Sequence, residues 1–89
     1  MRWTVSVARN AAKNLVKIPS KDRERVRIAL LEMELNPFSG DITHLWDMFP
    51  AFRRRVGSYR ILFDIFPSAR LVEVHDIRRR NEKTYRKNR

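Results

Sequence analysis

The chain has 89 residues, of which 20 are lysine or arginine and 10 are aspartate or glutamate, so its formal net charge is +10. An excess of this sign is typical of proteins whose partner is RNA, DNA, an acidic protein or an anionic surface. Hydrophobic residues make up 43% of the sequence, which predicts one folded domain over residues 1–89 rather than a disordered basic tail. The absence of cysteine excludes disulfides, thiolate metal sites and a cysteine nucleophile, and no apolar run is long enough to span a bilayer. We therefore expect a cytoplasmic protein with no membrane partner.

The N-terminal half predicts one strand and two helices. Apolar residues alternate over residues 2–7, as in a strand, and then take a helical spacing over residues 8–18. Pro19 ends this helix, and Ser20 is expected to cap a second helix over residues 21–35. Two amphipathic helices around a Pro-Ser turn predict a helical hairpin.

The segment over residues 38–50 is expected to be a loop, because it is rich in turn-forming residues. It also carries the apolar side chains Leu45, Trp46, Met48 and Phe49. Two interpretations are open, a buried flap over the core, which we favour, or a surface on which a partner docks.

The C-terminal half predicts strands. Phe52–Val56 and Tyr59–Phe66 flank Gly57-Ser58, a two-residue hairpin signal. A turn at Pro67-Ser68 leads to a third β segment over residues 71–77. The order β-α-α-β-β-β predicts an α+β fold, in which a helical hairpin packs on one face of an antiparallel sheet.

The predicted hairpin gathers three arginines on one face. With Gly57-Ser58 as the loop, Arg55 lies opposite Arg60, and strand alternation adds Arg53 to the same face. Like charges directly opposite each other across a strand pair are destabilising, and a bound phosphate would offset the repulsion. The alternative is a solvated face relieved by Asp64. We favour an anion site because the register and the net charge agree.

The other face of this hairpin is apolar and is expected to join the core. Arg54 interrupts it, and we expect its guanidinium to reach the sheet edge, with no functional role. His44 and His75 are lone histidines, and His75 is interpreted as structural. The sequence has no glycine-rich phosphate loop and no metal-ligand spacing, so we expect neither a metal nor a cofactor.

A basic tail with Arg78-Arg79-Arg80 and Tyr85 follows the last strand. A basic run is usually solvated, but this one leaves a core strand directly, so its first residues are expected to be held in place. Nearby positive charge lowers the pKa of a tyrosine, and a base can stack on its ring. The alternative is that Tyr85 pins the tail to the core.

A family resemblance rests on the order of these motifs. The hairpin segment R-V-G-S-Y-R over residues 55–60 is its most specific part. The other parts are the segment A-K-N-L over residues 12–15, the Ile18-Pro19 break, Asn36-Pro37, Leu45 and residues 74–85. In this order and spacing, nearly the whole chain resembles the RelE/ParE superfamily of bacterial and archaeal type II toxins.

The resemblance to RelE implies a ribosome-dependent mRNA endoribonuclease. Such toxins enter the A site of the 70S ribosome and cut mRNA by attack of a ribose 2′-OH on the adjacent phosphate, without a metal. The resemblance assigns the catalytic roles to Arg60, Arg79 and Tyr85. It assigns substrate binding to the other basic residues of the sheet and tail, which are Arg53, Arg55, Arg78 and Arg80.

The sequence departs from the RelE pattern at two points. Arginines occupy the sheet positions where relatives often have lysine, and an arginine cannot give up its proton at working pH. Ile77-Arg78-Arg79-Arg80 replaces a Gly-His-Arg element, so the histidine is absent. The general base is therefore expected to be Tyr85, with His75 in reserve, while Arg60 and Arg79 stabilise the pentacoordinate phosphate.

The resemblance also implies a partner and leaves alternatives open. Type II toxins are neutralised by a cognate antitoxin, and an acidic, partly disordered one would suit the charge of +10. The second hypothesis is a ParE-like, non-catalytic inhibitor of DNA gyrase. The third is a simple RNA- or DNA-binding module, with salt-dependent affinity and no turnover.

Overall fold

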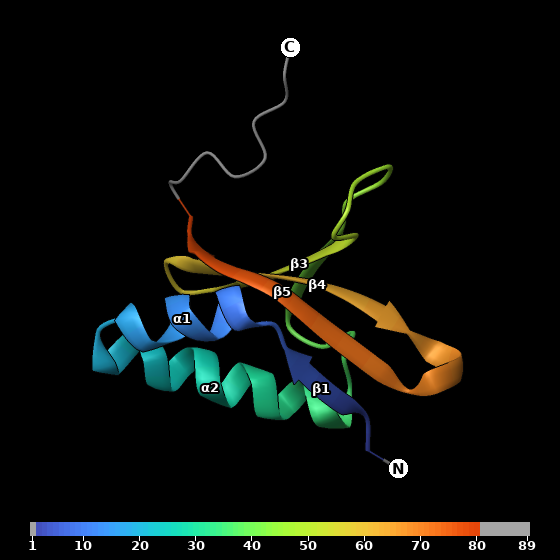
Figure 1. The fold of residues 1–89 in the computed structure, drawn as a ribbon, viewed down its shortest axis with the longest axis horizontal. Helices are drawn as coiled ribbons and strands as arrows, with labels where there is room; N and C mark the ends of the chain where they lie inside the picture. The colour runs from blue at the N-terminus through green and yellow to red at the C-terminus, as the bar shows by residue number, and fades with distance from the viewer. Residues whose placement is uncertain (1, 81–89) are drawn as a thin grey trace.

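Two helices and five strands make up the chain in the computed structural model, which describes residues 2–80 (Figure 1). In chain order the elements are β1 (Thr4–Val7), α1 (Arg9–Lys17), α2 (Ser20–Leu35), β2 (Asp41–His44), β3 (Phe52–Val56), β4 (Tyr59–Phe66), a 3-10 turn (Pro67–Ala69) and β5 (Leu71–Arg79). The bounds of β3 and β4 are those predicted from the sequence. The second helix begins at Ser20 instead of being capped by it, because Pro19 takes the cap position.

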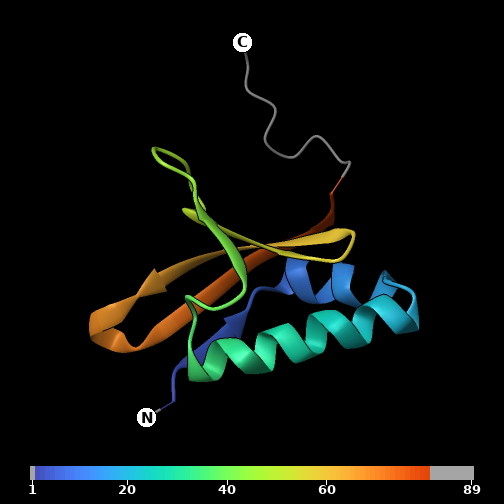
Figure 2. The same cartoon turned by 180° about the vertical axis from the view of Figure 1, so that it is seen from behind.

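The strands form one sheet in the order β1-β5-β4-β3-β2, and both helices cover the same face of it (Figures 1 and 2). The predicted α+β fold with a helical hairpin on one face is confirmed. One detail differs, because the sheet is mixed: β2 to β5 are antiparallel, but β1 pairs parallel to β5. The chain between β1 and β5 runs through both helices and strands β2 to β4, which provides the long connection that a parallel pair requires.

The register of the β3–β4 hairpin is the predicted one. Arg55 pairs with Arg60 and Val56 with Tyr59 around the Gly57-Ser58 turn. Gly57 has a φ of +58°, a left-handed conformation that favours glycine. This agreement fixes which side chains of the hairpin share a face.

The core lies between the sheet and the two helices, and α1 contributes the buried Ala11. Helix α2 contributes Val26, Ala29 and Met33, all buried, as its predicted apolar face requires. Strands β4 and β5 supply the opposing buried side chains, which are Tyr59, Ile61, Phe63, Val72, Val74 and Ile77. β4 is the central strand of the sheet, so the side chains that it presents on the face away from the helices have a rigid support.

The segment between α2 and β3 differs from its prediction in two ways. It contains the short edge strand β2, which pairs with β3. The expected buried flap is wrong, since Trp46 and Phe49 are 75% and 76% exposed. The connection from β2 to β3 rises from the sheet on the side away from the helices, so it does not cover the core (Figures 1 and 2).

None of the helices in the described part of the chain is long and apolar enough to cross a membrane.

Candidate nucleic-acid interface

Four arginines lie close together on the sheet face that the helices leave open. Arg60, in the central strand β4, pairs with Arg55 of β3 on one side and with Arg78 of β5 on the other. Arg53 lies two residues from Arg55 along β3 and faces the same way. We call these residues, Arg53, Arg55, Arg60 and Arg78, the arginine cluster.

The cluster places like charges side by side at the centre of the sheet, an arrangement that folding alone does not favour. Arg60 is only 9% exposed, so the surrounding strands hold its side chain in place. Arg55 is exposed, and Arg53 donates from Nη2 to Thr43 Oγ1 at 3.1 Å. The predicted grouping of Arg53, Arg55 and Arg60 on one face follows from this register.

Arg78 is oriented by a small polar network that reaches helix α1. Its Nε donates to Asp76 Oδ2 at 2.7 Å. The other oxygen, Asp76 Oδ1, accepts from Asn14 Nδ2 at 2.8 Å and from Asn10 Nδ2 at 3.1 Å. Helix α1 therefore holds the carboxylate that directs the Arg78 side chain along β5.

Arg79 lies on the opposite face of the sheet, apart from Arg60. It pairs with Tyr59, donates from Nη1 to Tyr59 Oη at 3.2 Å, and its guanidinium carbon lies 5.5 Å from the centre of the Tyr59 ring. The prediction joined Arg60 and Arg79 at one phosphate. Arg60 pairs with Arg78, however, and Arg79 follows Arg78 along β5, so Arg79 points to the opposite face. The buried Ile77, two residues earlier, is the sequence signal that would have placed Arg79 on the helix side.

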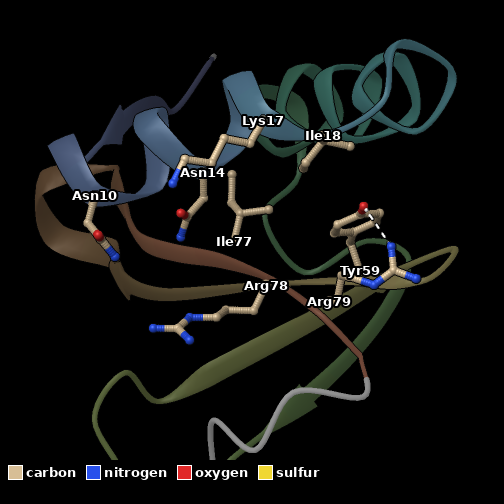
Figure 3. A pocket seen from close by; sticks show the side chains of 8 residues that line it. All are labelled: Asn10, Asn14, Lys17, Ile18, Tyr59, Ile77, Arg78 and Arg79. Atoms are coloured by element: carbon tan, nitrogen blue, oxygen red, sulfur yellow. Dashed lines mark hydrogen bonds between the residues drawn. The ribbon is translucent and has the colours of Figure 1, made fainter.

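Arg79 borders a polar pocket of about 290 Å³ between α1 and the ends of β4 and β5 (Figure 3). Asn10, Asn14 and Lys17 line it from the helix, and Arg78 reaches its rim from the sheet. Its lining is rich in cations and amide groups, so it can accept an acidic or otherwise polar segment.

Arg54 has a structural role that the sequence did not reveal. It does not reach the sheet edge as predicted, but is 8% exposed and pairs with Glu32 of α2. Its Nη1 also lies 3.4 Å from the carbonyl oxygen of Ala29 and from Ser39 Oγ. Gly40 makes room for it, because a Cβ there would lie 2.5 Å from Arg54 Nε.

His75 is held by a carboxylate on the same open face. Its Nε2 lies 3.1 Å from Asp64 Oδ2, while Asp64 Oδ1 accepts from the backbone N–H of Ala51 at 2.8 Å. Asp64 is therefore engaged by the β2–β3 connection and by His75. This pairing agrees with a structural role for His75.

Two predicted residues lie near or beyond the described end of the chain. Arg80 is exposed, and its backbone N–H donates to the Ser58 carbonyl oxygen at 2.7 Å, which ties the end of β5 to the hairpin turn. Tyr85, the predicted general base, lies outside the described residues. Within residues 2–80, no three potential metal-ligating side chains come together.

Comparison with known proteins identifies the fold. A chain of the archaeal RelE–RelB complex from Pyrococcus horikoshii OT3 is 18% identical, with a TM-score of 0.80 over 92% of this chain and 99% of that one. A chain of the RelBE2 toxin–antitoxin complex from Mycobacterium tuberculosis is 23% identical, with a TM-score of 0.77 over 90% and 100%. The isolated E. coli RelE toxin is 18% identical, with a TM-score of 0.75 over 90% and 86%.

The sequence matches no family model and no curated protein. The likeness is therefore one of three-dimensional structure, and it extends over 90–92% of this chain in the three comparisons. The helical hairpin and the five-stranded mixed sheet are the fold that this chain shares with these RelE structures.

Proposed function

We propose that the chain is a RelE-like toxin of a type II toxin–antitoxin system, an endoribonuclease that cuts mRNA in the ribosomal A site. The observation that carries the proposal is the arginine cluster on the open face of a RelE fold, with Arg60 nearly buried between two cationic neighbours. Guanidinium groups bind phosphate oxygens in a bidentate manner, so such a cluster suits the backbone of RNA.

The proposed reaction is a transesterification within the RNA. The 2′-oxygen attacks the adjacent phosphorus, its proton passes to a general base, and the bond from phosphorus to the 5′-oxygen breaks. The leaving oxygen takes up a proton, and the upstream fragment ends in a 2′,3′-cyclic phosphate. The protein contributes charge stabilisation to the pentacoordinate phosphate, and a guanidinium that is fixed in advance is suited to that role.

Within this proposal Arg60 stabilises the phosphate, while Arg53 and Arg55 bind the flanking backbone. An arginine is a poor general base, so we assign proton abstraction to Tyr85. Substrate binding by Arg78 and Arg80 is part of the same proposal. A direct role for Arg79 would require its guanidinium to leave Tyr59, to which it is hydrogen-bonded.

The proposed partner is an acidic antitoxin. The net charge of +10 favours it, as do the complexes named above, in which RelE-type chains are bound to RelB or form part of RelBE2. Neutralisation would follow if its acidic segments covered the arginine cluster or the polar pocket beside Arg79.

The test is cleavage of mRNA on purified ribosomes. Because Arg60 stabilises the transition state in this proposal, Arg60→Ala should slow cleavage about a hundredfold, as expected for loss of about 3 kcal/mol of such stabilisation. Arg79→Ala, on the other face, should slow it much less. Primer extension would locate the cuts, and plasmid supercoiling and mRNA integrity would be followed together in cells that express the chain.

Arg60 is nearly buried, so the folding of each Arg60 variant must be checked in parallel. Arg60→Lys keeps the charge but loses the bidentate fork, and it should retain the thermal unfolding transition while cutting more slowly than the wild type. Unchanged cleavage in Arg60→Ala would remove Arg60 from the mechanism. Loss of supercoiling with intact mRNA would overturn the nuclease proposal and favour the gyrase inhibitor.

A further inference from the structure

A second feature lies on the open sheet face, beside the arginine cluster. A pocket of about 290 Å³ is walled by the β2–β3 connection through Leu45, Met48, Phe49 and Pro50. The sheet supplies its floor through Leu62, His75 and Asp76. Its volume is near the lower end of the roughly 300–1,000 Å³ of small-molecule sites, which suits one ring system.

The pocket adjoins the cluster by register. Leu62 pairs with Arg53 on one side and with Asp76 on the other, and it lies two residues from Arg60 on the same face of β4. Two residues along a strand span about 7 Å. One nucleotide bridges such a distance between its phosphate and its base.

The wall of the pocket is aromatic and exposed. Phe49 is 76% exposed, and its ring centre lies 4.8 Å from that of His75. Folding gains little from an aromatic ring left in water. Proteins that bind single-stranded nucleic acid combine such rings with a cationic groove, because bases stack on the rings while cations follow the backbone.

The floor of the pocket presents polar groups of fixed direction. Asp64 engages Nε2 of His75 at 3.1 Å, and this leaves the other ring nitrogen as the one that can meet a base edge. The Asp76 carboxylate is held by Asn14 and Arg78, at 2.8 Å and 2.7 Å. An apolar wall with a few oriented polar groups is the usual composition of a specific ligand site.

We infer that this pocket binds the nucleobase next to the phosphate held by the arginine cluster. The base stacks on Phe49, and its edge faces His75. The inference rests on the proposed function for its ligand, single-stranded RNA, and gives that substrate a site of base selection. The other possible occupant, an apolar side chain of an antitoxin, would make no use of the oriented polar groups on the pocket floor.

The test compares two exposed aromatic residues of the same connection. Phe49→Ala removes the stacking wall. Trp46→Ala is the matched control, because Trp46 is equally exposed at 75% but contacts His44, at 3.8 Å between ring centres, and does not line the pocket. Both side chains are largely in water, so neither variant should lose its fold.

Binding is measured with a short single-stranded RNA and with matched RNAs that carry one abasic position each. For the wild-type chain, one abasic position should weaken binding about tenfold, the size expected for one stacked base. Phe49→Ala should weaken binding of the intact RNA by a similar factor, and then show no further loss at that position. Phe49→Trp should restore the abasic effect, and Trp46→Ala should behave as the wild type.

Three results would overturn the inference. One is an unchanged affinity in Phe49→Ala, and another is an abasic penalty that persists undiminished in that variant. The third is a Phe49→Ala variant that binds RNA as the wild type does but is no longer neutralised by a co-expressed antitoxin. That result would assign the pocket to the protein partner. These binding measurements do not depend on cleavage. RNA that is bound in this way but never cut would therefore refute the proposed nuclease function and leave the base site supported.

Discussion

At the scale of single residues, the buried Arg54 makes a prediction about stability. Glu32→Ala would leave the Arg54 guanidinium, 8% exposed, without its carboxylate partner. We expect the free energy of unfolding to fall by about 2 kcal/mol, less than the roughly 3–5 kcal/mol for a fully buried pair, because Glu32 is half-exposed. Arg54→Met, which removes the charge and keeps the volume, should cost less than Glu32→Ala in urea unfolding.

The control for this prediction lies on the same helix. Glu24 forms an exposed pair with Arg27, which lowers the pKa of the Glu24 carboxyl through a hydrogen bond. Exposed pairs of this kind add little to stability, so Glu24→Ala should leave the unfolding midpoint unchanged. A larger loss in Arg54→Met than in Glu32→Ala would contradict the assigned role of Arg54.

The residues of the site were predictable as far as the local pairing reached. A two-residue turn fixes its own register, so the facing of Arg55 and Arg60 followed from the sequence alone. The pairing of β5 with β4 depends on contacts distant in sequence, and the prediction placed Arg79 with Arg60 at one phosphate, although Ile77 two residues earlier points Arg79 to the helix side. The partner of Arg54, on α2, was likewise invisible to strand alternation.

At the scale of elements, the hairpin turn is the part on which the cluster depends. Gly57 has a φ of +58°, where a side chain is strained. Gly57→Val should destabilise the chain by about 1–2 kcal/mol, the cost of a left-handed conformation for a residue with a Cβ, whereas Gly57→Asn should be nearly neutral because asparagine tolerates that region. Thermal unfolding of both variants measures the difference, and equal losses would contradict it.

Elements with a strong pattern were predicted, and those defined by tertiary context were not. β3 and β4 have alternating or continuous apolar residues around a turn signal, and their bounds matched. Strand β2 has only four residues and follows Gly40, so turn formers obscured its pattern. Whether β1 runs parallel to β5, and whether the β2–β3 connection is buried, depends on where the helices pack.

At the scale of the whole molecule, the net charge of +10 could attract RNA anywhere, so the question is whether one face carries the binding. Arg55 is exposed within the arginine cluster, whereas Arg27 is exposed on α2, behind the sheet. Each phosphate contact adds about 0.7 to the slope of log affinity against log salt for a single strand. Titrations of RNA at several salt concentrations would measure this slope for Arg55→Ala and Arg27→Ala.

The two variants lose the same charge, so a diffuse field predicts the same effect for both. A localised interface predicts that Arg55→Ala lowers the slope by about 0.7, while Arg27→Ala leaves it at the wild-type value. Equal slopes in the two variants would refute the localised interface, since net charge alone would then account for binding. A reduced slope in Arg55→Ala alone would mean that RNA follows the open face of the sheet, where the strands hold Arg60 and where the apolar pocket begins.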